Sequence, residues 1–448
     1  MGYDVSVASK KGHRMRVLVG PLTSEGEATA LLPDGRVALV SGGCPGDVAE
    51  IDLVHPSGRR PHARILSLLE PSPDRVDAPC PYFAECSGCQ WQHVSPSAQL
   101  EAKTRLVAEA LADVPGLEAP LLPTVASPLS YGYRNELTLT ADESSGATHL
   151  GIASADGHSL VSVERCLLLP EPFRGVPRRL AGALRFLSGR HGPLGVRHVS
   201  LRVSPGTRDV EIALWTDPGA FPRRIAGKTL ADAVGATSVV RVLFRSADAS
   251  RRVVGFEVLA GRGVWSEAVW RRTFVVSAPS PFPANTSAAA LLVDAVVAGL
   301  APGPDDRVLD ARAGAGFVTA RLPERCERVV ALEACRFSLA NLRGNLENAG
   351  PGVEVVAGDP AHELPALGRF DLLVVSPPAT GLPDATVAAL AGTGARALAH
   401  IARTPASLAR DAARLRDASF RITRVEPYDL YPQTANVDTL AIFERDKP

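Results

Sequence analysis

The chain contains 448 residues, with 48 basic and 48 acidic side chains, and 46% of its residues are hydrophobic. This composition excludes an intrinsically disordered protein, and the length predicts about two to four domains. Because no apolar run has membrane-spanning length and no signal-peptide pattern is present, we expect a cytoplasmic protein that does not contact a membrane.

The charges are unevenly distributed along the chain. Residues 172–278 contain 18 Lys and Arg against 7 Asp and Glu, whereas residues 1–171 contain 13 against 21 and residues 279–448 contain 17 against 20. A strongly basic middle third predicts a surface that binds a polyanion such as RNA or DNA. An arginine-rich surface that is merely solvated is the alternative interpretation.

The first part of the chain, residues 1–70, alternates apolar and polar residues in five short runs. The turn sequences TSEG, PDG and CPGD separate these runs. Short strands with tight turns are typical of a small β-barrel of the kind that often binds oligonucleotides. Residues 71–130 then combine an irregular, cysteine-bearing half with an amphipathic helix that begins at about Ser95.

Residues 131–278 read mainly as strands, interrupted by one predicted helix with the sequence PRRLAGALRFLSG. In residues 279–448 the pattern changes, because short apolar runs such as RVVALEA and FDLLVVSPP alternate with helical segments. This alternation predicts a doubly wound parallel sheet. The expected fold class is therefore α/β, with an N-terminal β-barrel and a β-rich central domain before a Rossmann-like C-terminal sheet.

Four of the seven cysteines are placed where they suggest a metal site. Cys80, Cys86 and Cys89 lie within ten residues of each other, and Cys166 follows in VERCLLLP. Four thiolates suit zinc or an iron–sulfur cluster, although the missing second CxxC pair argues against an ordinary zinc ribbon. The alternative is that these are buried structural cysteines.

Glycines and acids mark the strand ends of the C-terminal sheet. The sequence VLDARAGAG, residues 308–316, follows a strand and precedes a helix, where backbone N–H groups receive ligands. Glu333 ends the next strand, Asp359 the third, and SPP at 376–378 the fourth. Together these features indicate a class I methyltransferase that uses S-adenosylmethionine. The alternative is a Rossmann-like domain whose acids merely cap helices.

These pieces, in this order, resemble the RNA uridine-C5 methyltransferases that act on tRNA and rRNA, and the resemblance covers nearly the whole chain. The sequence EGEATALLPDGRVALVSGGCPGDVAEIDLV is similar to the family's N-terminal TRAM barrel, and PQTANVDTLAIFER to its C-terminus. The resemblance implies structured RNA, rRNA or tRNA, as the partner, and we expect a monomer. It also implies a 4Fe-4S cluster held by Cys80, Cys86, Cys89 and Cys166. The family's central RNA-contacting domain is matched by the segments YGYRNELTL and GVRHVSLR. The resemblance therefore implies that RNA is bound by Arg134, Arg197 and Arg202.

The segment HIARTPASLARD, residues 400–411, aligns with the family's catalytic loop, which reads Ser-Cys-Asn-Pro and contains the nucleophilic cysteine. Arg403 stands at the cysteine position, directly before the helix cap Thr404. In the family the thiolate adds to C6 of uracil, so that C5 takes the methyl group from the sulfonium. A guanidinium cannot make that bond, since its pKa lies above about 12. None of the three remaining cysteines is placed to reach the uracil; these are Cys44, Cys326 and Cys335.

Other family positions differ as well. The glutamine of Phe-Gln-x-Asn is Pro283, the aromatic residue of the glycine loop is Arg312, and the aspartate of Asp-Pro-Pro-Arg is Ser376. The terminal general base, usually Glu, is Asp438, whereas Glu333 is retained. The catalytic positions are thus Arg403 and Asp438, and we expect a cofactor site formed by Pro283, Arg312, Gly314, Glu333, Asp359 and Ser376.

These substitutions favour an RNA-binding family member that does not perform thiolate-dependent C5 methylation. Two interpretations of the altered site stay open. One is relaxed constraint on a protein that no longer methylates; the other is a changed pocket in which Arg312 and Arg403 bind a phosphate or carboxylate. The alternative function is an active S-adenosylmethionine-dependent RNA methyltransferase with another mechanism or target atom.

Overall fold

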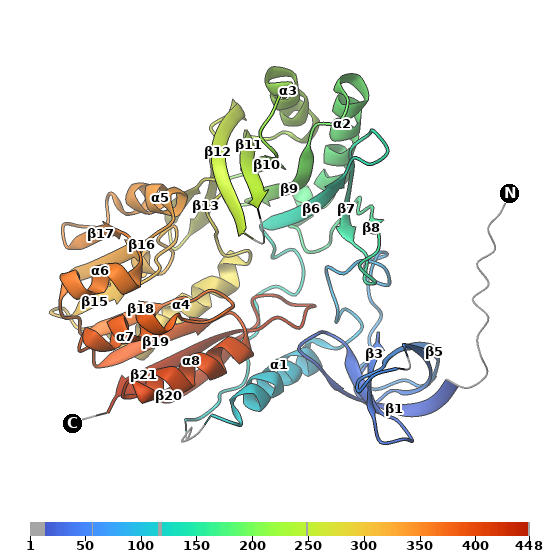
Figure 1. The fold of residues 1–448 in the computed structure, drawn as a ribbon, viewed down its shortest axis with the longest axis horizontal. Helices are drawn as coiled ribbons and strands as arrows, with labels where there is room; N and C mark the ends of the chain where they lie inside the picture. Colours follow the sequence, from blue (N-terminus) through green and yellow to red (C-terminus); the bar gives the residue numbers. More distant parts are fainter. Residues whose placement is uncertain (1–13, 56, 115–118, 248–249, 447–448) are drawn as a thin grey trace.

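The computed structural model describes residues 14–55, 57–114, 119–247 and 250–446 of the chain (Figure 1). The chain passes in order through a β-barrel, a connecting segment with one long helix, a central sheet and a C-terminal sheet. The predicted α/β fold class is confirmed, with each of its three β regions in its expected place. In the part of the chain that the structure describes, no helix is long and apolar enough to cross a membrane.

Five strands close into the N-terminal barrel in the spatial order β1-β2-β3-β5-β4. Val17, Val19 and Ile51 are buried in its core, as the alternating pattern predicts. Trp91, from the segment after the barrel, completes this core and donates its indole N–H to the carbonyl of Gly26 at 2.9 Å. The barrel strands are β1 (Arg14–Leu22), β2 (Ala28–Leu31), β3 (Val37–Ser41), β4 (Val48–His55) and β5 (His62–Glu70).

The helix α1 (Pro96–Leu111) joins the barrel to the C-terminal sheet. It begins where the sequence predicts, because the Ser95 hydroxyl accepts a hydrogen bond from a backbone N–H of the first turn. Leu106 packs in the barrel core, and Leu111 packs in the C-terminal core. This one helix therefore fixes the barrel against the C-terminal domain.

The central sheet has the order β12-β11-β10-β9-β6-β7-β8, and two helices cover one of its faces (Figure 1). The sequence pattern predicts one helix here, and the structure adds a second, α3. The apolar stripe of α3 is thin, because it contains four buried residues and one of them is Gly227. The helical period of hydrophobic residues in this segment is therefore weak. The elements are β6 (Glu136–Asp142), β7 (His149–Ala153), β8 (Leu160–Val161), η1 (Glu171–Phe173), α2 (Val176–His191), β9 (Val196–Val203), β10 (Val210–Thr216), α3 (Arg223–Val234), β11 (Ser238–Ala247) and β12 (Ser250–Gly261).

A short antiparallel hairpin, β13 (Trp265–Val269) and β14 (Arg272–Val276), follows the central sheet. Its side chains Trp265 and Phe274 are buried in the same core as α4 and the first C-terminal strand. The hairpin therefore packs with the C-terminal sheet.

The C-terminal sheet has the order β17-β16-β15-β18-β19-β21-β20. Its first five strands are parallel, and β21 and β20 add an antiparallel edge. Helices α4 and α5 pack on one face, and α6, α7 and α8 pack on the other. The strand order reverses between β15 and β18, the point at which such sheets bind ligands. The elements are α4 (Thr286–Leu300), β15 (Arg307–Asp310), η2 (Thr319–Glu324), β16 (Arg328–Glu333), α5 (Arg336–Leu346), β17 (Val353–Ala357), α6 (Pro360–Leu367), β18 (Leu372–Val375), α7 (Asp384–Gly392), β19 (Ala397–Ala402), α8 (Pro405–Asp417), β20 (Phe420–Tyr428) and β21 (Asp438–Arg445).

Candidate functional site

Two neighbouring cavities lie at the carboxyl ends of the parallel C-terminal strands. The first cavity, of about 380 Å³, is formed by the C-terminal domain, and the second, of about 360 Å³, lies between this domain and the central sheet. Both volumes fall within the range of about 300–1,000 Å³ that is typical of small-ligand sites. The two cavities share four lining residues: Pro281, Phe282, Arg403 and Tyr431.

Most of the expected cofactor residues are brought together in the first cavity. Its lining includes both catalytic positions, Arg403 and Asp438, and five cofactor positions: Pro283, Arg312, Gly314, Glu333 and Ser376. Asp359 is not among the described residues that line it. Its carboxylate accepts the backbone N–H of Ala361 at 2.9 Å and caps α6, the role that the alternative interpretation gave to such acids.

Glu333 holds the glycine loop in place at the end of β16. Its carboxylate accepts the backbone N–H of Gly314 at 2.8 Å and that of Cys335 at 2.7 Å. Gly316, in the same loop, has a φ of 90°, and a Cβ there would lie 3.0 Å from Leu342. Glu333 therefore shapes the loop as well as lining the cavity.

Asp310, at the end of β15, is a buried acid that the sequence analysis did not select. Burial raises the pKa of Asp310 to about 6, opposed by the hydrogen bond that the Thr319 hydroxyl donates to its carboxylate at 2.7 Å. This bond joins the two ends of the glycine loop. An acid as the last residue of the first apolar strand, in RVLD, is the signal that would have found it.

Arg403 lies in the turn between β19 and α8 and lines both cavities. The Thr404 hydroxyl caps α8 by accepting the backbone N–H of Ser407 at 3.2 Å, as predicted. Burial raises the pKa of Asp438 to about 7, and the positive charge of Arg403 opposes that rise. Burial also raises the pKa of Tyr431, against the same charge and a hydrogen bond from Arg403. The Asp438 carboxyl group and the Tyr431 hydroxyl group thus lie near the Arg403 cation, whose position the dipole of α8 disfavours.

A buried pair holds the scaffold of this turn. His400 Nε2 lies 2.9 Å from Asp411 Oδ2, and both side chains are fully buried. Asp411 also accepts the backbone N–H of Leu382 at 2.9 Å. The pair therefore joins β19, α8 and the loop after β18. The sequence does not predict this pair, because a single histidine in an apolar strand carries no specific signal.

The four expected cluster ligands line one small cavity of about 30 Å³, which we call the cysteine cavity: Cys80, Cys86, Cys89 and Cys166. Burial raises the pKa of the Cys86 and Cys166 thiols, and that of Cys89 to about 12. Among the described residues, no three Cys, His, Asp or Glu side chains are close enough to hold a single metal ion. The structure therefore brings the four cysteines to one cavity.

Helix α1 is hydrogen-bonded to the loop between β20 and β21. The Gln99 amide donates to Gln433 Oε1 at 3.0 Å and its oxygen accepts the Gln433 backbone N–H at 3.0 Å. Lys103, fully buried, donates to Asp429 at 2.5 Å and to the carbonyl of Tyr431 at 3.1 Å. Because Tyr431 lines both cavities, these contacts build part of the site wall.

The three expected RNA-binding arginines have different surroundings. Arg202 is buried, and its guanidinium donates to Glu136 and to two backbone carbonyls, so it supports the wall of the second cavity. Arg197 is exposed and pairs with Asp217 at 2.7 Å. Arg134 lines both the second cavity and the cysteine cavity, and its buried Nε has no hydrogen-bond partner in the described structure.

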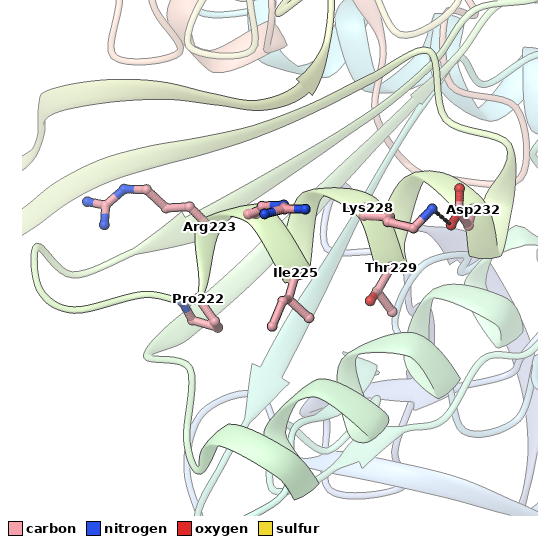
Figure 2. A pocket seen from close by; sticks show the side chains of 7 residues that line it. Pro222, Arg223, Ile225, Lys228, Thr229 and Asp232 are labelled. Atoms are coloured by element: carbon pink, nitrogen blue, oxygen red, sulfur yellow. Dashed lines mark ion pairs between the residues drawn. The ribbon is translucent and has the colours of Figure 1, made fainter.

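A further hollow lies on the outer helix α3 of the central domain (Figure 2). Its side chains include the exposed pair Lys228–Asp232, at 3.0 Å, and Arg223, which pairs with Glu257 at 2.7 Å. None of the predicted site residues lines this hollow. It lies within residues 172–278, the stretch with the excess of basic residues.

A doubly wound sheet with an antiparallel edge, a glycine loop and acids at its strand ends defines a class I methyltransferase fold. A TRAM domain model matches residues 8–54. The chain is 30% identical to an uncharacterised RNA methyltransferase of Gloeobacter violaceus, over 97% of each chain. It is 28% identical to the 23S rRNA (uracil(1939)-C(5))-methyltransferase of Pseudomonas putida, over 97% of this chain and 94% of the relative. The chain belongs to the RNA uridine-C5 methyltransferase family.

A solved structure supports the fold at the level of the whole chain. The tRNA (uracil-54, C5)-methyltransferase of Pyrococcus abyssi, in complex with S-adenosyl-L-homocysteine, matches with a TM-score of 0.74. The match covers 96% of this chain and 100% of that one at 22% identity. The fold of this chain is therefore similar to that of the Pyrococcus abyssi protein over nearly the whole length of both.

Proposed function

We propose that this protein binds structured RNA, tRNA or rRNA, and does not methylate uridine C5 through a covalent thiolate. The observation that carries the proposal is Arg403, which lines both cavities where they meet. Cys335 lines the first cavity beside Glu333, and no cysteine is among the described residues that line the second. The point where the base and the methyl donor would meet therefore has a guanidinium in place of the nucleophile.

The first cavity is the proposed place for S-adenosylmethionine. The glycine loop and Glu333 support binding, because backbone N–H groups and a strand-end acid are the usual partners of such a cofactor. The changed side chains Pro283, Arg312 and Ser376 oppose it. The complex of the Pyrococcus abyssi protein with S-adenosyl-L-homocysteine adds support for this ligand class.

Calorimetry with S-adenosylmethionine and a tritium-transfer assay on bulk tRNA and rRNA test the proposal. We expect RNA binding that weakens steeply with salt, because of the basic central domain, and no tritium in 5-methyluridine. Formation of 5-methyluridine by the pure protein would refute the proposal. Methyl transfer to another position would instead favour an active methyltransferase with a different mechanism or target atom.

We also propose that Cys80, Cys86, Cys89 and Cys166 hold a 4Fe-4S cluster. Four partly buried thiols around one cavity fit a group that binds thiolates, and a single zinc ion would require sulfur atoms about 2.3 Å from one centre. In a 4Fe-4S cluster each thiolate binds a different iron atom, so the four sulfur atoms need not converge on one centre. Such a cluster would hold the connecting segment against the central domain, a structural role.

Replacing Cys86 with Ser is expected to abolish iron binding. Anaerobically purified wild-type protein should contain iron and acid-labile sulfide and should be brown, whereas Cys86→Ser should be colourless, since one of four ligands is lost. Cys335→Ser is the matched control and should keep the iron, because Cys335 does not line the cysteine cavity. Colourless wild-type protein with one bound zinc would contradict the cluster.

A further inference from the structure

The outer surface of α2 carries positive charge that neither cavity of the proposed site uses. The sixteen residues of this helix include four arginines and no acidic residue. All four arginines are exposed. Among the described residues, Arg178 alone of the four is in an ion pair, with Glu164 at 3.7 Å. The helix α2 therefore presents to solvent a group of cations that few acids neutralise.

This surface lies on the opposite side of the central sheet from the second cavity. Leu137 and Leu201 are buried in one core with the apolar side chains of α2. Their sequence neighbours Glu136 and Arg202 line the second cavity. Because successive side chains of a strand point to opposite faces, the sheet separates α2 from this cavity. Figure 1 shows α2 at the periphery of the molecule. An RNA segment held at the cavity therefore leaves this surface open.

The exposed arginines of α2 form two rows along the helix. Seven residues make about two turns and eleven make about three, so Arg178 and Arg185 share one row and Arg179 and Arg190 share the other. The second row spans about 16 Å, at about 1.5 Å per residue. The Arg190 guanidinium lies over the Phe186 ring, 5.6 Å from its centroid, and this contact holds it in its row. Cations spread over this length suit a polyanion better than a single phosphate ion.

No side chain larger than hydrogen stands between the two rows. The positions there are occupied by Gly182 and Gly189, and both are exposed. A Cβ added at either glycine would meet nothing within 4 Å, so packing inside the protein does not require glycine at these positions. Glycine also destabilises a helix interior relative to alanine. The two glycines leave a smooth strip between the arginine rows, which a chain of phosphates can approach closely.

The neighbouring helix α3 does not offer the same arrangement. Its Lys228 pairs with Asp232 at 3.0 Å, as Figure 2 shows, and its Arg223 pairs with Glu257 at 2.7 Å. These acids already neutralise the two cations. The surface of α2 is therefore the better candidate for a polyanion, and α3 provides matched control residues.

We infer that α2 binds the phosphodiester backbone of RNA along the strip between its two arginine rows. The inference rests on the proposed RNA binding and adds a second contact surface, for an RNA segment other than the one at the cavities. Guanidinium groups pair with phosphate oxygens through two parallel hydrogen bonds, and such contacts do not read the base sequence. A protein partner fits less well, because Phe186 is the one large hydrophobic side chain of α2 that is exposed.

Binding of a labelled structured RNA, measured at several salt concentrations, tests this surface. The double variant Arg179→Gln and Arg190→Gln loses two phosphate contacts, so the slope of log affinity against log salt should fall by about two. Its affinity at about 0.1 M salt should fall about tenfold to a hundredfold. The control is the double variant Arg223→Gln and Lys228→Gln, which removes the same charge from α3. Its salt slope should change by less than about one.

The double variant Gly182→Ala and Gly189→Ala separates RNA contact from folding. Its Tm should rise, because alanine favours the helix and each added methyl group has open space. Its affinity for RNA should nevertheless fall several-fold, because the methyl groups occupy the strip. A higher Tm with unchanged affinity would overturn the strip as the binding place.

Two further results decide between the surface and the proposed function. An unchanged salt slope in the arginine variant, or an equal loss in the α3 control, would overturn the α2 surface alone. Failure of the wild-type protein to bind any RNA would overturn the proposed function together with it.

Discussion

Arg403→Cys, which restores the family's nucleophile, is expected to show no appreciable uridine-C5 methylation. We expect its methyl transfer to stay at least about a hundredfold below that of the Pseudomonas putida relative, the smallest usual effect of losing one preorganised hydrogen-bond donor from an active site. The reason is that a thiol alone does not rebuild the site. Pro283 has no side-chain amide, and Ser376 has no carboxylate, where the family uses both.

The charge of Arg403 also affects the acid at the base position. Burial raises the pKa of Asp438 to about 7, and Arg403 and Lys103 oppose that rise. Removing the cation at position 403 therefore raises the pKa of Asp438 further. The carboxyl group of the variant therefore stays protonated over a wider pH range than in wild type, which makes it a poorer acceptor for the C5 proton. Any residual activity should increase as the pH rises through this pKa.

The assay is tritium transfer from S-adenosylmethionine to unmodified rRNA and tRNA, followed by nucleoside analysis. Arg403→Ser is the matched control, since it removes the same charge without adding a thiol. Rates that are equal in the two variants would support the prediction. Appreciable 5-methyluridine from Arg403→Cys, and none from Arg403→Ser, would mean that the substitutions at Pro283 and Ser376 do not matter.

The residues predicted from the sequence come together mainly because they end parallel strands. Glu333 is the last residue of one strand, and Ser376 and Arg403 directly follow two others of the same sheet. The carboxyl ends of parallel strands meet at the same edge of a sheet. The four cysteines were also predicted as a group and line one cavity. Motif order and strand period are therefore sufficient to place these side chains.

Other parts of the site depend on contacts between distant segments, which no local pattern shows. The pair Gln99–Gln433 joins residues 334 positions apart, and both side chains read as ordinary polar residues in the sequence. Arg202 was predicted to contact RNA because it is an arginine in a matching segment. Its hydrogen bonds inside the protein are set by the neighbouring strand and by the chain after the hairpin. Sequence position cannot separate an arginine that supports a wall from one that is free to bind.

Replacing Lys103 with Met is expected to lower the free energy of unfolding by about 3–5 kcal/mol, the usual cost of removing one partner of a buried ion pair. The Lys103 ammonium is fully buried and donates to Asp429 at 2.5 Å and to the carbonyl of Tyr431 at 3.1 Å. Methionine fills a similar volume but leaves the Asp429 carboxylate buried without its cation. The loss is large because this contact joins α1 to the loop that forms a wall of both cavities.

The loss of unfolding free energy in Lys103→Met should increase with pH. Burial already raises the pKa of Asp429, and loss of the Lys103 charge raises it further. A carboxyl group whose pKa is raised in the folded state stabilises that state at low pH, and this contribution is lost as the pH rises through the folded pKa. The difference in unfolding free energy between wild type and Lys103→Met should therefore be larger at pH 8 than at pH 5.

Urea unfolding followed by circular dichroism measures the difference in unfolding free energy between wild type and Lys103→Met. Two further variants show whether the ion pair is its cause. Lys103→Met combined with Asp429→Asn should recover a large part of the loss, because the unpaired carboxylate is removed with the lysine. Lys228→Met is the exposed control, since its pair with Asp232 lies on the surface of α3 and should contribute little. If Lys103→Met unfolds like Lys228→Met, with no recovery in the double variant, the ion pair does not hold the cavity wall in place. In that case the packing of Leu106 and Leu111 would have to fix α1 between the barrel and the C-terminal sheet.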